Sequence, residues 1–163
     1  MPLLLARIDD RLIHGQVAHG WSRALKPTLL VIVSAALRDR PVDAELYLMA
    51  IPDGATGCVV TAEEALDPAF RARVDEERTI LLFPDAQEAL RLVEGGFPLE
   101  TLNLGGLHFA AGKREVLPYV FLDKEDAARL RRLRDLGVKL VAQDLPANPA
   151  HPIGEILDEA NWL

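Results

Sequence analysis

The chain has 163 residues, of which 50% are hydrophobic, and it carries 18 basic against 25 acidic side chains, a formal net charge of −7. This length and composition predict one globular domain with its own core, and the acidic balance argues against a nucleic-acid-binding protein, which needs a basic face. The single cysteine, Cys58, excludes an internal disulfide and suits a reducing cytosol; its apolar surroundings predict a buried structural thiol.

Apolar runs predict strands at residues 3–6, 29–33, 57–60, 79–83, 101–104 and 138–142. Between them, helical spacing and end signals predict helices at 17–21, at about 42–51, from 62, from 84 to 94, and from a cap at 123 to about 136. Residues 115–122 are predicted as an additional edge element, and residues 153–162 as a short amphipathic helix. The alternation predicts an α/β fold of three layers, α/β/α, with a mainly parallel central sheet of about six or seven strands and no domain boundary within residues 1–163.

No segment reaches the roughly 20 apolar residues that a membrane-spanning helix needs. The first residues, Met1-Pro2-Leu3, lack the charged and then apolar layout of a signal peptide. We therefore expect a soluble, intracellular protein whose role at a membrane, where it has one, comes through partners.

Residues 7–17, RIDDRLIHGQV, crowd two arginines, two aspartates and a histidine at the end of the first predicted strand, where open α/β sheets bind ligands. A phosphoryl-accepting histidine needs an outward ring nitrogen, a partner that fixes the other nitrogen, and donors for the phosphoryl oxygens. His14 can supply the first, and Asp9, Asp10 or a backbone carbonyl the second. The candidate donors are Arg7, Arg11 and the backbone N–H groups near Gly15 and Gln16.

The residues alone leave other interpretations of this stretch open. It can be a charged helix entry, with Asp9 or Asp10 as the N-cap and solvated arginines. The domain can also be a small phosphoester hydrolase that uses His14 as general base, or a regulatory module that senses phosphorylation without sugar transfer. A metal site is disfavoured, because Cys58 is the only thiol and no second close histidine has ligand spacing.

Three segments, RIDDRLIHGQVAHGW (7–21), LNLGGLHFAAGKREV (102–116) and VFLDKEDAARLRRLRDLGVKL (120–140), together resemble the mannose/sorbose-type enzyme IIB of the bacterial sugar phosphotransferase system. The resemblance implies that a IIA protein or domain phosphorylates His14, on Nδ1, and that the group then passes to a sugar presented by the membrane permease IIC/IID. This is the activity of a protein-N(pi)-phosphohistidine–sugar phosphotransferase. The resemblance also implies the three-layer fold and a cytoplasmic place at the inner membrane through the permease, and it calls for no cofactor.

The glycine pair Gly105-Gly106 follows the fifth predicted strand, where it can form a tight turn or let the backbone approach a ligand or another loop. The resemblance places this loop near the active histidine, so both glycines are second-tier site residues. Near the end of the second strand the family usually carries an acidic residue, where this chain has Ser34-Ala35.

Three further features receive no part in the chemistry. His108, between Leu107 and Phe109, is expected to be a packed, hydrogen-bonded histidine rather than a ligand. Gly112-Lys113 does not complete a nucleotide-binding loop, so no ATP or magnesium site is expected. An arginine-rich helix is expected to present a solvated face or a docking surface for an acidic partner; it carries Arg129, Arg131, Arg132 and Arg134. The sequence leaves open which sugar is transferred and whether the protein forms a homo-oligomer.

Overall fold

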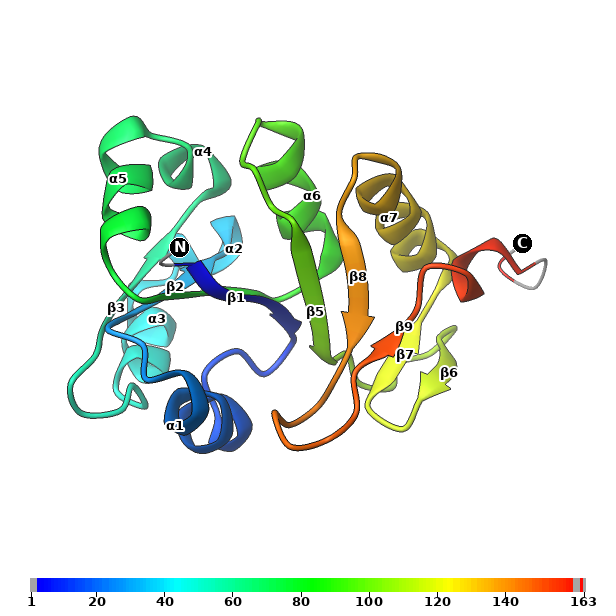
Figure 1. The fold of residues 1–163 in the computed structure, drawn as a ribbon, viewed down its shortest axis with the longest axis horizontal. Helices are drawn as coiled ribbons and strands as arrows, with labels where there is room; N and C mark the ends of the chain where they lie inside the picture. Colours follow the sequence, from blue (N-terminus) through cyan, green and yellow to red (C-terminus); the bar gives the residue numbers. More distant parts are fainter. Residues whose placement is uncertain (1–2, 160–161, 163) are drawn as a thin grey trace.

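The computed structural model of the protein describes residues 3–159 and 162. A seven-stranded sheet in the order β3-β2-β4-β1-β5-β8-β9 forms its centre (Figure 1), and its neighbouring strands pair in parallel except β8 and β9. The predicted three-layer architecture is therefore confirmed. The strands are β1 (Leu3–Asp9), β2 (Leu29–Val33), β3 (Thr56–Val60), β4 (Thr79–Phe83), β5 (Thr101–Gly106), β8 (Lys139–Ala142) and β9 (His151–Pro152).

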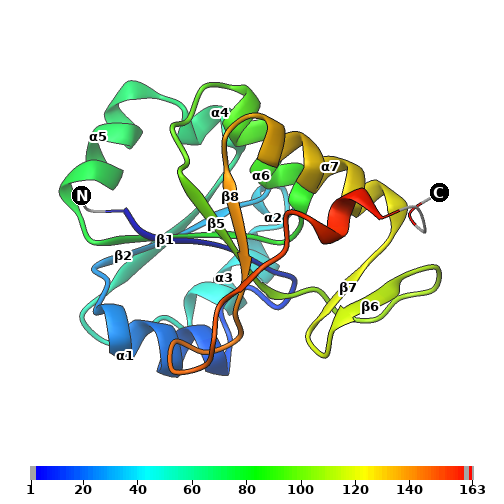
Figure 2. The same ribbon diagram turned by 45° about the vertical axis from the view of Figure 1, so that its right-hand side comes forward.

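Helices cover both faces of this sheet (Figures 1 and 2). One face carries η1 (Gln16–Trp21), α1 (Ser22–Leu25) and α3 (Pro41–Leu48), and the short α2 (Ala35–Arg38) links β2 to α3. The other face carries α4 (Ala62–Ala65), α5 (Pro68–Glu76), α6 (Ala86–Glu94) and α7 (Lys124–Asp135). None of the helices within the described ranges is long and apolar enough to cross a membrane.

The central strands are buried on both sides, as their uninterrupted apolar runs predict. In β4, Leu81 and Phe83 pack into the core under α4–α7, whereas Ile80 and Leu82 pack into the core under η1 and α3. Each of these side chains is fully buried, and burying one of this size contributes about 1.5–3 kcal/mol. Cys58 is half-buried, and this burial raises the pKa of its thiol.

The helix-capping motifs that the sequence predicts are present in the structure. Thr61 and Glu64 make a reciprocal capping box at α4, with backbone-to-side-chain bonds of 3.0 Å in both directions. Asp123 caps α7 in the same way with Asp126. Gly137 stops that helix with a φ of +96°, which a glycine adopts without strain.

Several boundaries differ from the prediction. β1 extends to Asp9 and β5 to Gly106, so Arg7, Asp9 and both glycines lie in strands, whereas Arg11 and His14 lie in the connection between β1 and η1. Residues 114–122 form a separate antiparallel hairpin of β6 (Arg114–Leu117) and β7 (Val120–Leu122), which projects from the body in Figure 2. The expected terminal helix is reduced to the 3₁₀ turn η2 (Ile156–Asp158), and residues 160, 161 and 163 lie outside the described part of the chain.

The expected arginine face of α7 is also corrected. On α7, Arg131 donates to the Leu157 carbonyl at 2.6 Å and Arg134 to the Gly154 carbonyl at 2.7 Å, so these arginines bind the C-terminal tail instead of facing solvent alone. Leu46 on α3 and Met49 at its C-terminal cap are exposed, at 63% and 75%. The inward face of α3 is formed by smaller or polar-tipped residues, Ala44 and Tyr47.

Candidate functional site

The candidate site lies at the carboxyl ends of β1 and β5, which are neighbours in the sheet. The chain leaves β1 toward β2 through η1 on one face, and leaves β5 toward β8 through α7 on the other, so the two exits diverge. Ligands bind at such switch points in open α/β sheets. The backbone joins the two strand ends, because the Asp10 N–H donates to the Gly106 carbonyl at 2.9 Å.

Arg7 is a fully buried side chain beneath the site. Burial lowers the pKa of its guanidinium to about 10, although the neighbouring Asp9 charge acts in the opposite direction. The group therefore stays cationic at neutral pH. Its face also lies 5.1 Å from the Trp21 ring centroid. Its acceptors are Asn103 Oδ1 at 2.8 Å, the Gln143 carbonyl at 2.8 Å, the Asp144 carbonyl at 3.0 Å and Asp9 Oδ2 at 3.4 Å.

This environment differs from the solvent-facing position expected of a donor to a phosphoryl group. The guanidinium has no exposed surface and is engaged by β5 and by the segment that follows β8. Gly105 makes room for it: a Cβ at this glycine would lie 1.8 Å from Arg7 Cζ. The glycine is therefore explained by close approach and not by a turn, since its φ is not positive.

Asp9 is the fully buried carboxylate that connects the site residues. Its Oδ1 accepts from the Arg11 backbone N–H at 3.0 Å and lies 3.5 Å from Arg11 Nε. Its Oδ2 pairs with Arg7 at 3.4 Å and lies 3.6 Å from His14 Nε2. One carboxylate thus fixes both arginines and faces the histidine ring.

His14 sits in the loop between β1 and η1 with 18% of its side chain exposed. Its Nδ1 lies 3.0 Å from the Leu12 carbonyl, which can only accept a hydrogen bond. Leu12 adopts a φ of +54°, an uncommon conformation for a branched side chain, and its burial in the core under η1 holds it there. Both ring nitrogens therefore face oxygen acceptors, one from the backbone and one from Asp9.

The remaining expected residues border this ring. Arg11 is 41% exposed, and a Cβ on Gly106 would lie 3.4 Å from its NH2 and 3.0 Å from Asp9 Oδ1. Gly15 is exposed, with open space around its Cβ position. Gln16 begins η1, a helix whose wider turn is completed by a bond from Ser22 N–H to the Val17 carbonyl; the Gln16 side chain is outside the described part of the structure.

His108 belongs to the site surroundings, which the sequence did not predict. Its backbone N–H donates to Asp10 Oδ2 at 2.8 Å and its Nδ1 lies 2.6 Å from Asp10 Oδ1. The expectation of a hydrogen-bonded histidine is confirmed, but the expected packing is wrong, because 47% of the side chain is exposed. This contact ties the loop after β5 to the turn after β1.

Asn103, Gln143 and Asp144 were also missed. Their only signal is a polar residue at or after the end of an apolar strand, which Asn103 shows within β5 and Gln143-Asp144 show after β8. At the end of β2, the Ala35 N–H donates to Glu88 Oε2 at 3.1 Å. An acidic side chain therefore does lie at this strand end, contributed by α6, and burial raises the pKa of Glu88.

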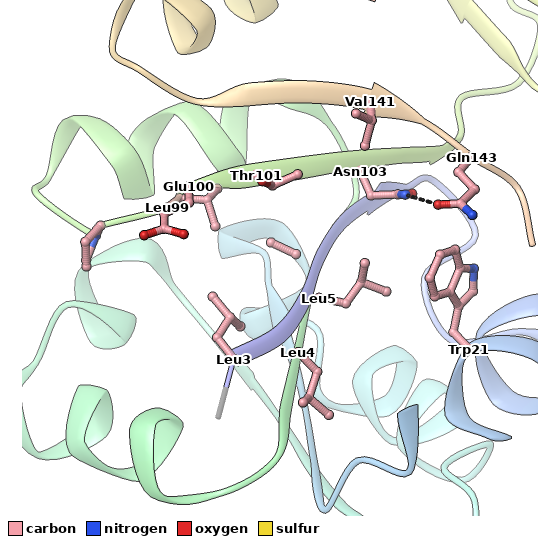
Figure 3. Close-up of a pocket in the computed structure, with 12 residues that line it drawn as sticks. Leu3, Leu4, Leu5, Trp21, Leu99, Glu100, Thr101, Asn103, Val141 and Gln143 are labelled. Carbon is pink, nitrogen blue, oxygen red and sulfur yellow. Dashed lines mark hydrogen bonds between the residues drawn. The ribbon is translucent and has the colours of Figure 1, made fainter. Parts of the chain in front are cut away.

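A hollow lies beside the site on the sheet face that α1 and α3 leave uncovered (Figure 3). Its wall is mostly aliphatic, and it ends at the Asn103–Gln143 pair, where Asn103 Nδ2 donates to Gln143 Oε1 at 3.5 Å. Neither His14 nor Arg11 lines it, so we assign it no part in chemistry at His14. Within residues 3–159 and 162, no group of three or more His, Cys, Asp or Glu side chains is placed to hold a metal ion.

Comparison with known proteins identifies the family. Residues 3–163 match the family model "PTS system sorbose subfamily IIB component". The chain is 36% identical to the sorbose-specific EIIB component of Lacticaseibacillus casei over 98% of this chain and 97% of that protein. It is 34% identical to the mannose-specific EIIAB component of Escherichia coli K12 over 91% of this chain and 46% of that longer protein.

Among solved structures, the IIBSor domain of the sorbose permease from Klebsiella pneumoniae superposes with a TM-score of 0.88 at 33% identity, covering 98% of both chains. The likeness thus extends over the whole fold and not only over the motif around His14. The chain belongs to the sorbose subfamily of IIB components of the sugar phosphotransferase system.

Proposed function

We propose that residues 1–163 act as a single phosphocarrier domain that accepts a phosphoryl group from a IIA protein on His14 and passes it to a sugar presented by the membrane permease IIC/IID. Family membership supports a phosphotransferase role in general. The position of His14 carries the specific assignment: the ring lies at the switch point, partly exposed, between the Asp9 carboxylate and the exposed Arg11. The protein would then work in the cytoplasm, at the inner membrane through the permease.

Nδ1 is the proposed acceptor atom. Its lone pair attacks phosphorus in line, the bond from phosphorus to the IIA histidine nitrogen breaks, and that electron pair returns to the IIA imidazole. Because Nδ1 contacts the Leu12 carbonyl in this structure, the ring must first turn away from that oxygen. The proton then belongs on Nε2, which lies 3.6 Å from Asp9 Oδ2 before the ring turns, and the negative charge of the nearby Asp9 stabilises the cationic phosphorylated ring.

The second transfer reverses this chemistry. A sugar hydroxyl attacks phosphorus and loses its proton to a base at the permease or to solvent water, the bond to His14 breaks, and the imidazole recovers its lone pair. A carrier must hold the phosphoryl group without binding it deeply. The exposed guanidinium of Arg11 and the backbone N–H groups near Gly15 suit this, since they are accessible to solvent and form no closed cage.

Mass mapping after incubation with phosphorylated IIA tests the assignment. We expect one acid-labile phosphoryl group on the peptide that contains His14, and none on His14→Gln with its fold intact. A labelled and active His14→Gln variant, or label on His19 or His108 alone, would refute the role of His14. Sustained hydrolysis of a small phosphoester without IIA would favour the hydrolase, which none of the family matches supports.

A further inference from the structure

Phe109 is an exposed aromatic side chain beside the candidate site. It is 71% exposed, and among the described residues the other exposed large apolar side chains are aliphatic, three of them on or just after α3. An aromatic ring left in water gains about 1.5–3 kcal/mol when a partner covers it. Aromatic side chains supply much of the binding energy at protein interfaces.

The loop that carries Phe109 is fixed at several points. Leu107 exchanges backbone bonds with the hairpin, donating to the Tyr119 carbonyl at 3.0 Å and accepting from the Phe121 N–H at 2.8 Å. His108 is held by both oxygens of Asp10. The Phe109 ring rests edge-on against Phe121, with centroids 5.9 Å apart and planes at 84°. A ring positioned in this way loses little conformational freedom when it binds.

The Asp10–His108 contact joins this loop to the catalytic turn. Asp10 directly follows Asp9, the carboxylate that faces His14. His108 is bound to Asp10, and Phe109 is the next residue after His108, so Phe109 is held close to this turn. The exposed guanidinium of Arg11 follows Asp10 in the chain and offers donors for the oxygens of an incoming phosphoryl group. A partner that reaches His14 through a standard interface covers about 800 Å² on this side, an area that takes in the neighbouring loop.

We propose that residues 108–112 form a docking loop for the IIA phosphocarrier, with Phe109 entering an apolar recess next to its phosphohistidine. This inference rests on the proposed function, because it names the surface through which that transfer is made. The negative phosphoryl group would approach Arg11 and His108, while the uncharged ring provides affinity that does not depend on salt.

The test compares Phe109→Ser with Met49→Ser, a matched loss of an exposed apolar side chain just after α3, where the wild-type residue is 75% exposed. Single-turnover transfer to His14 is measured over a range of concentrations of the phosphorylated IIA protein from the same organism. We expect the half-saturating IIA concentration to rise about tenfold or more for Phe109→Ser, with the plateau rate within about twofold of wild type. Met49→Ser should match wild type in both, and Phe109→Leu should fall between.

Each contrary result has a separate meaning. An unchanged half-saturating concentration, or an equal rise in Met49→Ser, overturns the docking role. A fall in the plateau rate alone overturns it as well, because the loop would then position His14 rather than bind the partner. If Phe109→Ser accepts the phosphoryl group from IIA normally but no longer transfers it to sugar in permease vesicles, the docking role for IIA is overturned, and the loop contacts IIC/IID instead. If wild-type protein accepts no phosphoryl group from IIA, the proposed function itself fails.

Discussion

Replacing Gly105 with alanine tests the buried arginine network directly. The added Cβ would lie 1.8 Å from Arg7 Cζ and 2.0 Å from NH2, whereas ordinary van der Waals contact begins at about 3.4 Å. The guanidinium must therefore move by more than its bonds of 2.8–3.0 Å to Asn103, Gln143 and Asp144 allow. Overpacking costs about 1–3 kcal/mol, and breaking a buried charge pair costs about 3–5 kcal/mol.

We therefore expect Gly105→Ala to lower the free energy of unfolding by about 3–5 kcal/mol, a large share of the usual 5–15 kcal/mol. Urea denaturation followed by far-UV circular dichroism measures this, with an unchanged m-value as the sign of two-state unfolding. Gly15→Ala is the matched control, since its backbone is helical, at φ −49°, with open space around the Cβ position. It should be neutral or slightly stabilising. Equal effects at the two glycines would refute the reasoning.

Two other predictions concern charge. Arg11→Ala should slow single-turnover transfer to His14 about 10–100-fold, because a charge-assisted hydrogen bond to a phosphoryl oxygen is lost. The half-saturating IIA concentration should change little. An unchanged transfer rate would show that Arg11 takes no part in the chemistry. Glu88→Gln keeps an acceptor for the Ala35 N–H and removes a carboxylate whose pKa burial raises in the folded state. Above its raised pKa, the buried Glu88 carboxylate is ionised in the folded protein and opposes folding, so Glu88→Gln should have a higher free energy of unfolding than wild type at pH 8. This difference should vanish as the pH falls below 4.5, the ordinary pKa of the group, where Glu88 is protonated in both the folded and the unfolded state. A difference independent of pH in urea denaturation would contradict this.

The architecture follows from signals that act over short stretches of chain. Uninterrupted apolar runs predicted the strands because both faces of the sheet are covered by helices. Thr61 with Glu64, and Gly137, marked helix ends through contacts within a few residues. The cluster from Asp9 to His14 could be recognised for the same reason, since its members are neighbours in sequence and meet in one turn.

The parts that could not be predicted depend on distant segments. Arg7 looks like a solvent-facing donor until its acceptors, 96 to 137 positions away, are known. The glycine pair fits either a turn or a close approach, and only the position of that guanidinium decides between them. His108 lies between two apolar residues and so suggests packing, but Asp10, in the turn after β1, holds it at the surface.

The separation between Arg7 and its carbonyl acceptors also bears on synthesis. The Gln143 and Asp144 carbonyls come 136 and 137 positions later, so a growing chain on the ribosome holds Arg7 without these two acceptors until residue 144 has emerged. Contacts of such long sequence separation form late and slowly. A chain that ends before residue 143 thus displays the His14 motif without the two carbonyls that hold the Arg7 guanidinium beneath it.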